Sequence, residues 1–135
     1  MSKNILIIED EFFISMILKD TVTRFGYNVV DIVRYGEKVI ESIEKSNPKP
    51  DLILADIYLP GPMSGIDAAR LINEKYDIPI IFITAYSDRA TKAKADEVDH
   101  AAFLSKPYHD GELKRVIQEA LGSKTLNQLK TNRKI

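Results

Sequence analysis

Polar side chains that could carry out chemistry follow four short, mostly apolar runs in this sequence. The runs are residues 5–8, 52–55, 80–83 and 103–105, and behind them come Glu9, Asp10 and Glu11, then Asp56, then Thr84, then Lys106. Apolar runs without alternation are typical of strands buried on both faces, as in a parallel sheet. Ligands of such sheets bind outside the carboxyl ends of the strands. We therefore expect several acids, a hydroxyl and a lysine to converge on one crevice.

Glu9, Asp10 and Asp56 would place three carboxylates in a small volume. Their repulsion is costly unless a cation shares the site or some of them stay protonated. Oxygen ligands without histidine or cysteine favour a hard cation, and Mg²⁺ is the usual partner of phosphate groups. The residues themselves therefore predict a cation site, with Mg²⁺ as the best candidate.

Segments with helical spacing of apolar residues alternate with these runs along the chain. The spacing is clearest over residues 113–121 and weakest over 88–98, where most apolar side chains are alanines. Residues 28–33 form a further strand, and Asp31 in its middle suits the edge of a sheet. The pattern predicts an α/β fold, a three-layer sandwich with helices on both faces of a parallel sheet and right-handed crossovers.

Three of the helices are predicted from apolar residues that recur at helical spacing. Gly26 ends the first, and Pro48 and Pro50 follow the second. The recurring residues are Ile14, Ile17, Leu18, Val22 and Phe25 in the first helix, Val39, Ile40 and Ile43 in the second, and Ile66, Ala69, Ile72 and Tyr76 in the third. The breaker-rich residues 59–65 between the third strand and the third helix predict a loop over the crevice.

Composition limits the classes of protein to which the chain can belong. Its 135 residues are 44% hydrophobic and 29% charged, which suits the core of one domain. A net charge of -1 gives no reason to expect a nucleic-acid or membrane surface. The absence of cysteine excludes disulfides and thiolate metal sites. The first apolar run is too short for a signal peptide or a membrane span, so we expect a soluble, cytoplasmic protein.

The domain is expected to cover residues 1–122, and residues 123–135 are expected to form a polar, basic carboxyl-terminal tail. The tail is too short to form a second domain, and its basic residues are Lys124, Lys130, Arg133 and Lys134. We interpret it as a frayed extension or flexible tail and not as a docking segment.

The ordered set Glu9-Asp10, Asp56, Thr84-Ala85 and Lys106-Pro107 resembles the response-regulator receiver domain of two-component signalling. The resemblance covers about residues 3–121 and is specific, because each residue must directly follow its own strand. It implies a flavodoxin-like fold with five helices and a five-stranded parallel sheet in the order 2-1-3-4-5. It also implies a stand-alone receiver of the chemotaxis type, which is no enzyme beyond its own phosphorylation and slow dephosphorylation.

By this resemblance, Asp56 is the nucleophile that takes a phosphoryl group from phosphohistidine, forming an aspartyl phosphate. Asp10 and Asp56 would ligate Mg²⁺ together with the backbone carbonyl of Tyr58. Glu9 would act on the metal mainly through bound water.

Four further residues receive roles from the same resemblance. Lys106 would supply positive charge to the phosphoryl oxygens, and Thr84 would give its hydroxyl to one of them. Phe103 matches the switch aromatic of the family, which is expected to turn inward when Thr84 moves toward the phosphate. The Lys106-Pro107 peptide bond is expected to be cis.

Tyr58 and Tyr86 lie two residues past the phosphoacceptor and two past the threonine. By resemblance, these positions flank the line along which water attacks the phosphorus. Rings there would exclude or misalign that water, and neither phenol is a base at neutral pH. We therefore expect a long-lived phosphoryl group. The alternative is that both rings face solvent or a partner.

Three other functions use similar residues. A haloacid-dehalogenase-like phosphohydrolase needs a second acid two residues after its nucleophile, where Tyr58 stands. A flavodoxin-like cofactor binder needs a phosphate-binding loop where Glu9, Asp10 and Glu11 would repel phosphate. A degenerate receiver that acts without phosphorylation stays open, although the intact set of residues argues against it.

The implied partners are a histidine kinase or a histidine phosphotransfer protein, and an unknown downstream protein. We expect a monomer or a phosphorylation-dependent dimer, and neither a nucleic acid nor a membrane as a partner of this chain. Asp99-His100 replaces the Gly-Ala pair often seen before the fifth strand, so the usual partner surface there is expected to be individual to this protein. His100 and His109 lack a third ligand at metal-binding spacing, and we interpret both as surface residues.

Overall fold

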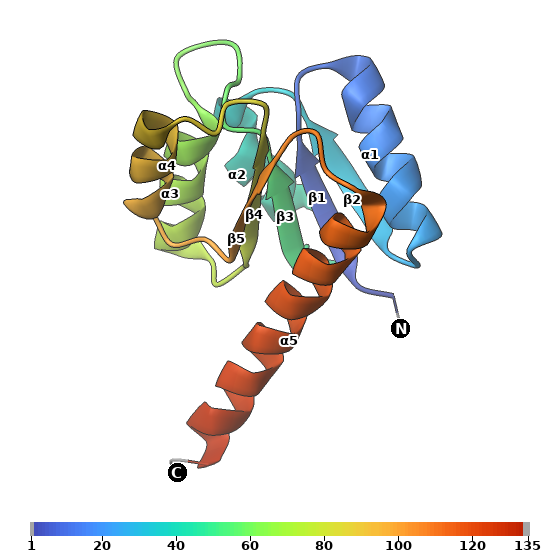
Figure 1. Ribbon diagram of the computed structural model, residues 1–135. Coiled ribbons are helices and arrows are strands. Elements are labelled where there is room, and N and C mark those ends of the chain that lie inside the picture. Colours follow the sequence, from blue (N-terminus) through green and yellow to red (C-terminus); the bar gives the residue numbers. More distant parts are fainter. Residues whose placement is uncertain (1, 134–135) are drawn as a thin grey trace.

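Five parallel strands form one sheet in the order β2-β1-β3-β4-β5. The computed structural model describes residues 2–133 and, within them, the side chains of residues 2–122. The strands are β1 (Asn4–Ile8), β2 (Asn28–Val33), β3 (Leu52–Ala55), β4 (Ile80–Thr84) and β5 (Ala102–Ser105). The predicted parallel sheet and its strand order are confirmed (Figure 1).

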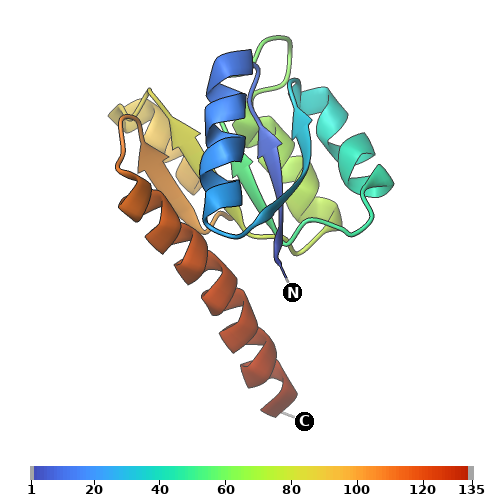
Figure 2. The same ribbon diagram turned by 90° about the vertical axis from the view of Figure 1, so that its right-hand side faces the viewer.

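Helices cover both faces of this sheet, as Figures 1 and 2 show. The two on one face are α1 (Phe12–Arg24) and α5 (Asp110–Arg133), and the three on the other face are α2 (Val39–Lys45), α3 (Gly65–Lys75) and α4 (Arg89–Asp96). A short 3-10 helix, η1 (Gly36–Lys38), precedes α2. The predicted three-layer α/β sandwich is therefore confirmed.

The side chains of β1 alternate between two hydrophobic cores. Ile5 and Ile7 belong to the core beneath α1 and α5, whereas Leu6 and Ile8 belong to the core beneath α2, α3 and α4. All four are at most 1% exposed. A strand buried on both faces has no polar side to show, which is why β1, β3 and β4 are continuous apolar runs in the sequence.

Strand β2 lies at one edge of the sheet, as Asp31 indicated. The register against β1 shifts between Ile5 and Leu6, so that Val30 is an extra residue in β2. Asp31 is exposed, and its Oδ2 accepts a hydrogen bond from Ser42 Oγ of α2 at 2.6 Å. The edge position therefore leaves a carboxylate in solvent where a central strand would bury it.

Helix α1 packs differently from the prediction at one position. The predicted helix is present, but Ile17, one of the apolar residues from which it was predicted, is 66% exposed while Ser15 and Thr21 are buried. Ser15 Oγ donates to the carbonyl of Phe12 at 2.7 Å, and Thr21 Oγ1 donates to the carbonyl of Ile17 at 2.9 Å. Hydroxyls that bond to their own helix can be buried without an unpaired polar atom.

The outer side of α1 carries large hydrophobic side chains instead. Its exposed large hydrophobic residues are Phe12, Phe13, Met16 and Ile17. At about 100° per residue, these four lie on the side of the helix opposite Leu18, which is buried. We call these four residues the α1 apolar face.

Helix α5 continues past Gly122 to Arg133, and its last turns extend beyond the sheet (Figure 1). The predicted tail is therefore helical as far as Arg133, which fits a segment without proline and with several good helix formers. Side chains beyond residue 122 and all of residues 134–135 lie outside the described part. The division of the chain into a domain and a tail stays a prediction.

Among residues 2–133, the length and apolar character that a membrane-crossing helix needs do not occur together in any helix.

Candidate functional site

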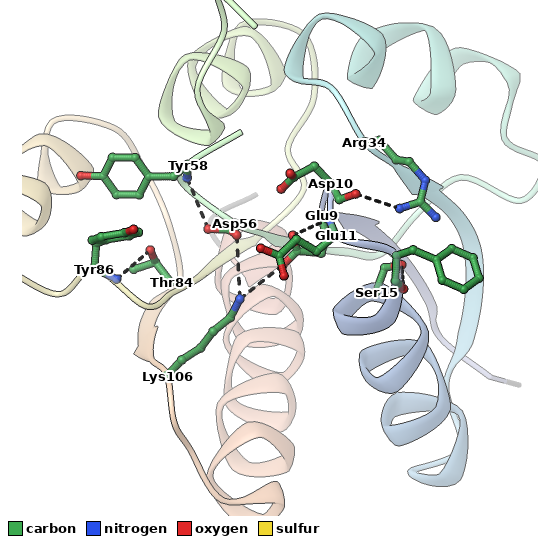
Figure 3. Close-up of polar contacts among 11 residues, drawn as sticks. Glu9, Asp10, Glu11, Ser15, Arg34, Asp56, Tyr58, Thr84, Tyr86 and Lys106 are labelled. Atoms are coloured by element: carbon green, nitrogen blue, oxygen red, sulfur yellow. Dashed lines mark hydrogen bonds and ion pairs between the residues drawn. The ribbon is translucent and has the colours of Figure 1, made fainter. Parts of the chain in front are cut away.

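The predicted site residues meet at the carboxyl ends of β1, β3, β4 and β5 (Figure 3). The sheet ladder continues one residue past the strands: the amide of Asp56 donates to the carbonyl of Ile8 at 2.9 Å, and the amide of Lys106 donates to the carbonyl of Thr84 at 2.8 Å. Backbone bonds of the rigid sheet therefore hold Asp56 and Lys106 in place. The Lys106-Pro107 peptide bond that follows is cis.

Glu9, Asp10 and Asp56 form an acidic cluster at this edge. Each offers one carboxylate oxygen, and these oxygens all lie within 4.8 Å of one another. Glu9 is buried, whereas Asp10 and Asp56 are half-buried and reach the surface. Three hard oxygen donors with an opening to solvent suit a small divalent cation that keeps water ligands, as Mg²⁺ does. The donor set therefore fits the predicted metal.

Lys106 supplies the positive charge beside this cluster. Its Nζ lies 3.3 Å from Glu9 Oε1 and 3.8 Å from Asp56 Oδ2. One ammonium faces two carboxylates, and Asp10 adds a third nearby. The cluster therefore keeps an excess of negative charge.

Burial of this charge changes the proton affinity of two acids. Burial raises the pKa of Glu9 from 4.5 to about 7; the amide of Glu11 and the ammonium of Lys106 act against the rise, and the charge of Asp56 adds to it. Burial also raises the pKa of Asp56, and Lys106 opposes that rise. In the absence of a cation, the Glu9–Asp56 pair therefore tends to keep a proton near neutral pH.

Thr84 ends β4 and is completely buried. Its Oγ1 accepts a hydrogen bond from the amide of Tyr86 at 3.1 Å. Phe103 lies on the neighbouring strand β5, half-buried against the core beneath α4, and the ammonium of Lys92 lies 5.8 Å from the centre of its ring. Phe103 thus lies against α4, and the role of Thr84 and Phe103 as a switch stays a prediction.

The rings of Tyr58 and Tyr86 pack against each other, with centroids 4.6 Å apart and planes at 64°. The backbone amide of Tyr58 donates to Asp56 Oδ1 at 3.3 Å, but the ring of Tyr58 points away from the Asp56 carboxylate (Figure 3). The hydroxyl of Tyr58 lies 2.5 Å from Thr91 Oγ1 of α4. About half of each tyrosine is exposed to solvent. The predicted effect of the two rings on the water that attacks the phosphorus stays a prediction.

Gly65 sets the shape of the loop behind Asp56. Its amide donates to the carbonyl of Ile57 at 2.7 Å. A Cβ at this position would overlap the carbonyl oxygen of Asp56 and lie 2.9 Å from Ile57 Cα. The capping box of Ser64 and Asp67 starts α3 at the same point. Only glycine lets α3 begin this close to the backbone of the site.

Sequence reasoning missed Arg34, which borders the acidic cluster. Its guanidinium donates from Nη1 to the carbonyl of Asp10 at 3.1 Å and lies 5.5 Å from the ring centre of Phe12. Arg34 directly follows β2, so the rule applied to the other strands would have found it.

The prediction that His100 is a surface residue is wrong. Only 14% of its side chain is exposed, and its ring lies 5.2 Å from that of Phe82 at 50°. Nδ1 lies 2.9 Å from the carbonyl of Val98, which gives a polar atom of this half-buried ring a partner. The turn between α4 and β5 thus brings His100 over the core, whereas His109 is exposed as predicted.

Comparison with known proteins gives a family. The sequence matches the family described as Response regulator receiver domain over residues 5–118. It is 37% identical over 121 residues to the phyllosphere-induced regulator PhyR of Methylorubrum extorquens. This match covers 90% of this chain and 44% of PhyR. It is 33% identical to the chemotaxis protein CheY of Thermotoga maritima, over 80% of this chain and 88% of CheY.

The solved structures agree with these relatives. The receiver domain of the sensor histidine kinase PA1611 from Pseudomonas aeruginosa, with a magnesium ion coordinated in its active-site cleft, is 27% identical and gives a TM-score of 0.80. The match covers 90% of this chain and 99% of that domain. Several curated relatives are longer, and the chain spans about half of their length.

Proposed function

The chain belongs to the response regulator receiver domain family of two-component systems, and we propose that it takes a phosphoryl group from a histidine kinase or a histidine phosphotransfer protein onto Asp56. The observation that carries this proposal is the meeting of Asp56 with Lys106 and with two further carboxylates at one edge of the sheet. Transfer of a phosphoryl group to a carboxylate needs such a nucleophile beside positive charge.

In the proposed step, a carboxylate oxygen of Asp56 forms a bond to phosphorus while the bond between phosphorus and the donor's imidazole nitrogen breaks. The imidazole keeps the electron pair of that bond and takes up a proton from solvent. The Lys106 ammonium, 3.8 Å from Asp56 Oδ2, balances charge on the phosphoryl oxygens. The hydroxyl of Thr84 then donates to one of those oxygens.

Asp10, Asp56 and the backbone carbonyl of Tyr58 would hold Mg²⁺, and Glu9 would reach it through water. The carboxylate oxygens of the acidic cluster support this assignment by their number and spacing. When bound, Mg²⁺ would offset negative charge on the carboxylates and on the incoming phosphoryl group.

The α1 apolar face suits a docking surface for the protein that donates the phosphoryl group. It begins at Phe12, two residues past Asp10, and Arg34 links that ring to the carbonyl of Asp10. A donor helix on this face would therefore sit at the rim of the acidic cluster. Exposed aromatic and methionine side chains are also enriched at protein interfaces.

The phosphorylated domain would signal to a partner protein by a conformational change that involves Thr84 and Phe103. The described residues would make no contact with nucleic acid. The domain would act in the cytoplasm, either as a monomer or as a phosphorylation-dependent dimer. Its own chemistry would be limited to phosphorylation and slow dephosphorylation of Asp56. A phosphohydrolase is disfavoured because position 58, where such an enzyme needs an acid, carries a tyrosine whose hydroxyl lies against Thr91.

Labelling with a small phosphodonor such as phosphoramidate tests this function directly. With Mg²⁺ present, the wild-type protein should gain the mass of one phosphoryl group, and the product should be acid-stable and base-labile. Asp56→Asn should not be labelled. Asp96→Asn, which changes an aspartate whose side chain is 72% exposed at the end of α4, should label like the wild type. Labelling of Asp56→Asn at the wild-type rate would rule out the proposed role of Asp56.

Docking can be separated from chemistry with two donors. Phe13→Ser, in the most exposed residue of the α1 apolar face, should slow transfer from a phosphorylated histidine phosphotransfer protein. The same variant should react with phosphoramidate at the wild-type rate, because the small donor needs no docking surface. Equal slowing with both donors would argue against a docking role.

A further inference from the structure

A short chain of hydrogen bonds joins the loop that carries Asp56 to the amino end of α4. The hydroxyl oxygen of Tyr58 lies 2.5 Å from Thr91 Oγ1, and Thr91 Oγ1 lies 2.7 Å from Asp88 Oδ1. Asp88 is the N-cap of α4, and its Oδ2 accepts from the amide of Thr91 at 3.4 Å. We call this chain the Tyr58–Thr91–Asp88 relay.

Which group donates in each hydrogen bond of the relay follows from Asp88, the acceptor at its end. Hydrogen bonding by Thr91 lowers the pKa of Asp88, so Asp88 is a carboxylate that only accepts. Thr91 has a single hydroxyl proton, which goes to Asp88, and its oxygen then accepts the proton of the Tyr58 hydroxyl. Each bond in such a chain polarises and strengthens the next.

Helix α4 depends on polar contacts more than α3 does. Of its eight residues, only Thr91 and Ala95 are buried, whereas α3 buries five of its eleven residues. A helix with little buried apolar area opens at a low cost in free energy. Thr91, which is 3% exposed, is therefore both a main packing contact of α4 and the residue that Tyr58 holds.

The other end of the relay touches the site itself. The amide of Tyr58 donates to Asp56 Oδ1 at 3.3 Å, and the ring of Tyr58 packs on Tyr86, whose amide donates to Thr84 Oγ1. A rigid ring carries any movement of the Tyr58 backbone to its hydroxyl. A displacement of about 1 Å is enough to break a hydrogen bond of this length.

We propose that Tyr58 is a positioning residue whose hydroxyl holds the amino end of α4 in the unphosphorylated protein, and that phosphorylation of Asp56 loosens this hold. A phosphoryl group on Asp56 would compete for the amide of Tyr58 and shift the backbone to which the ring is attached. The first half concerns the unmodified protein alone. The second half rests on the proposed function.

Hydrogen exchange of the amides of α4 tests the first half. Tyr58→Phe keeps the ring and removes the hydroxyl, so it should speed exchange of α4 about three- to tenfold, the effect of one lost hydrogen bond. Exchange in α3 and α5 should not change. Thr91→Val should have at least as large an effect, and Thr91→Ser should restore slow exchange. Tyr35→Phe, in another tyrosine about half exposed, should leave α4 as in the wild type.

A double variant distinguishes the relay from two unrelated contacts. In the Thr91→Val background, Tyr58→Phe should add nothing, because its acceptor is already gone. Additive effects, or unchanged α4 exchange in Tyr58→Phe, would overturn the first half of the proposal.

Beryllofluoride with Mg²⁺, which mimics a phosphoryl group on an aspartate, tests the second half. It should speed α4 exchange in the wild type and have less effect in Tyr58→Phe, where the hold is already lost. An equal increase in both proteins would overturn the second half. If beryllofluoride changes the hydrogen exchange of no amide in any of these proteins, the proposed function fails together with the second half of the proposal. Hydrogen exchange of α4 in the proteins without beryllofluoride still decides the first half.

Discussion

The ammonium of Lys106 lies closer to Glu9 than to Asp56, at 3.3 Å from Glu9 Oε1 against 3.8 Å from Asp56 Oδ2. Glu9 is also the more deeply buried of the two acids, with 4% of its side chain exposed against 15% for Asp56. A buried charge needs a partner more than a partly solvated one does. In the unmodified protein, Lys106 therefore compensates Glu9 first, and it lies within reach of new negative charge on Asp56.

The raised pKa of Glu9 predicts how stability depends on pH. In the folded protein the Glu9 carboxyl keeps its proton up to about pH 7, whereas in the unfolded chain it loses this proton near pH 4.5. The metal-free protein should therefore lose stability as pH rises through this window, by on the order of a few kcal/mol. Glu9→Gln should flatten this dependence and be more stable than the wild type at about pH 8. Urea denaturation in the presence of a chelator measures both proteins.

Glu74→Gln provides the control for that experiment, because Glu74 is an exposed glutamate of α3. Its curve should run parallel to that of the wild type. Parallel curves for Glu9→Gln and the wild type would contradict the assignment of the proton to Glu9.

Magnesium should stabilise the fold, because it relieves the repulsion within the acidic cluster. A ligand that binds only the native state adds about 2.7 kcal/mol at a hundredfold excess over its dissociation constant. Asp10→Asn should raise the stability of the metal-free protein and weaken the response to Mg²⁺. Melting temperatures of both proteins across a Mg²⁺ titration provide the measurement. Wild-type melting that is indifferent to Mg²⁺ would speak against the site.

Thr84→Ala should uncouple phosphorylation from the change around Phe103. The hydroxyl of Thr84 is fully buried and would be the donor to the phosphoryl group, so its loss removes the link but not the nucleophile. We expect labelling at Asp56 to persist, with smaller beryllofluoride-induced NMR shifts at Phe103 and in α4. Thr84→Ser keeps the hydroxyl and should behave like the wild type. Full-sized shifts in Thr84→Ala would refute the coupling.

Gly65→Ala should destabilise the protein and disturb the site, because the new Cβ would overlap the backbone of Asp56. Overpacking of this kind costs about 1 to 3 kcal/mol. Gly111→Ala is the matched control, since a Cβ there meets nothing within 4 Å in the first turn of α5. Denaturation and phosphoramidate labelling of both variants provide the test. A Gly65→Ala protein as stable and as reactive as Gly111→Ala would exclude a role for this close contact.

The lifetime of the phosphorylated protein should depend on the rings of Tyr58 and Tyr86. If the rings misalign the attacking water and so raise the activation free energy of hydrolysis by about 1 to 2 kcal/mol, hydrolysis slows roughly five- to thirtyfold. Replacing both rings, with Tyr58→Asn and Tyr86→Glu, should therefore speed decay of the phosphoryl group after the donor is removed. Tyr58→Phe, which keeps both rings, should decay like the wild type. Decay no faster in the double variant would show that the rings do not set the lifetime.

The sheet and the site were predictable from the sequence because both follow from local rules. A strand buried on both faces, such as β3, must be a continuous apolar run, and the residue after it must emerge at the ligand-binding edge. Asp56 and Lys106 could therefore be placed together without knowing any distance. The same rule, applied to β2, would have added Arg34.

Only the tertiary structure decided the contacts between residues far apart in the chain. Tyr58 and Thr91 are 33 residues apart, and Lys106 and Glu9 are 97 apart. No pattern in the sequence pairs Tyr58 with Thr91, and the strand-end rule could not show that Lys106 lies closer to Glu9 than to Asp56. Both results depend on how a helix or a loop sits on the sheet and on which rotamer each side chain takes. The packing of α1 has a similar cause. Its helical spacing could not show that Ile17 faces solvent, since Thr21 can be buried once its hydroxyl finds a backbone carbonyl.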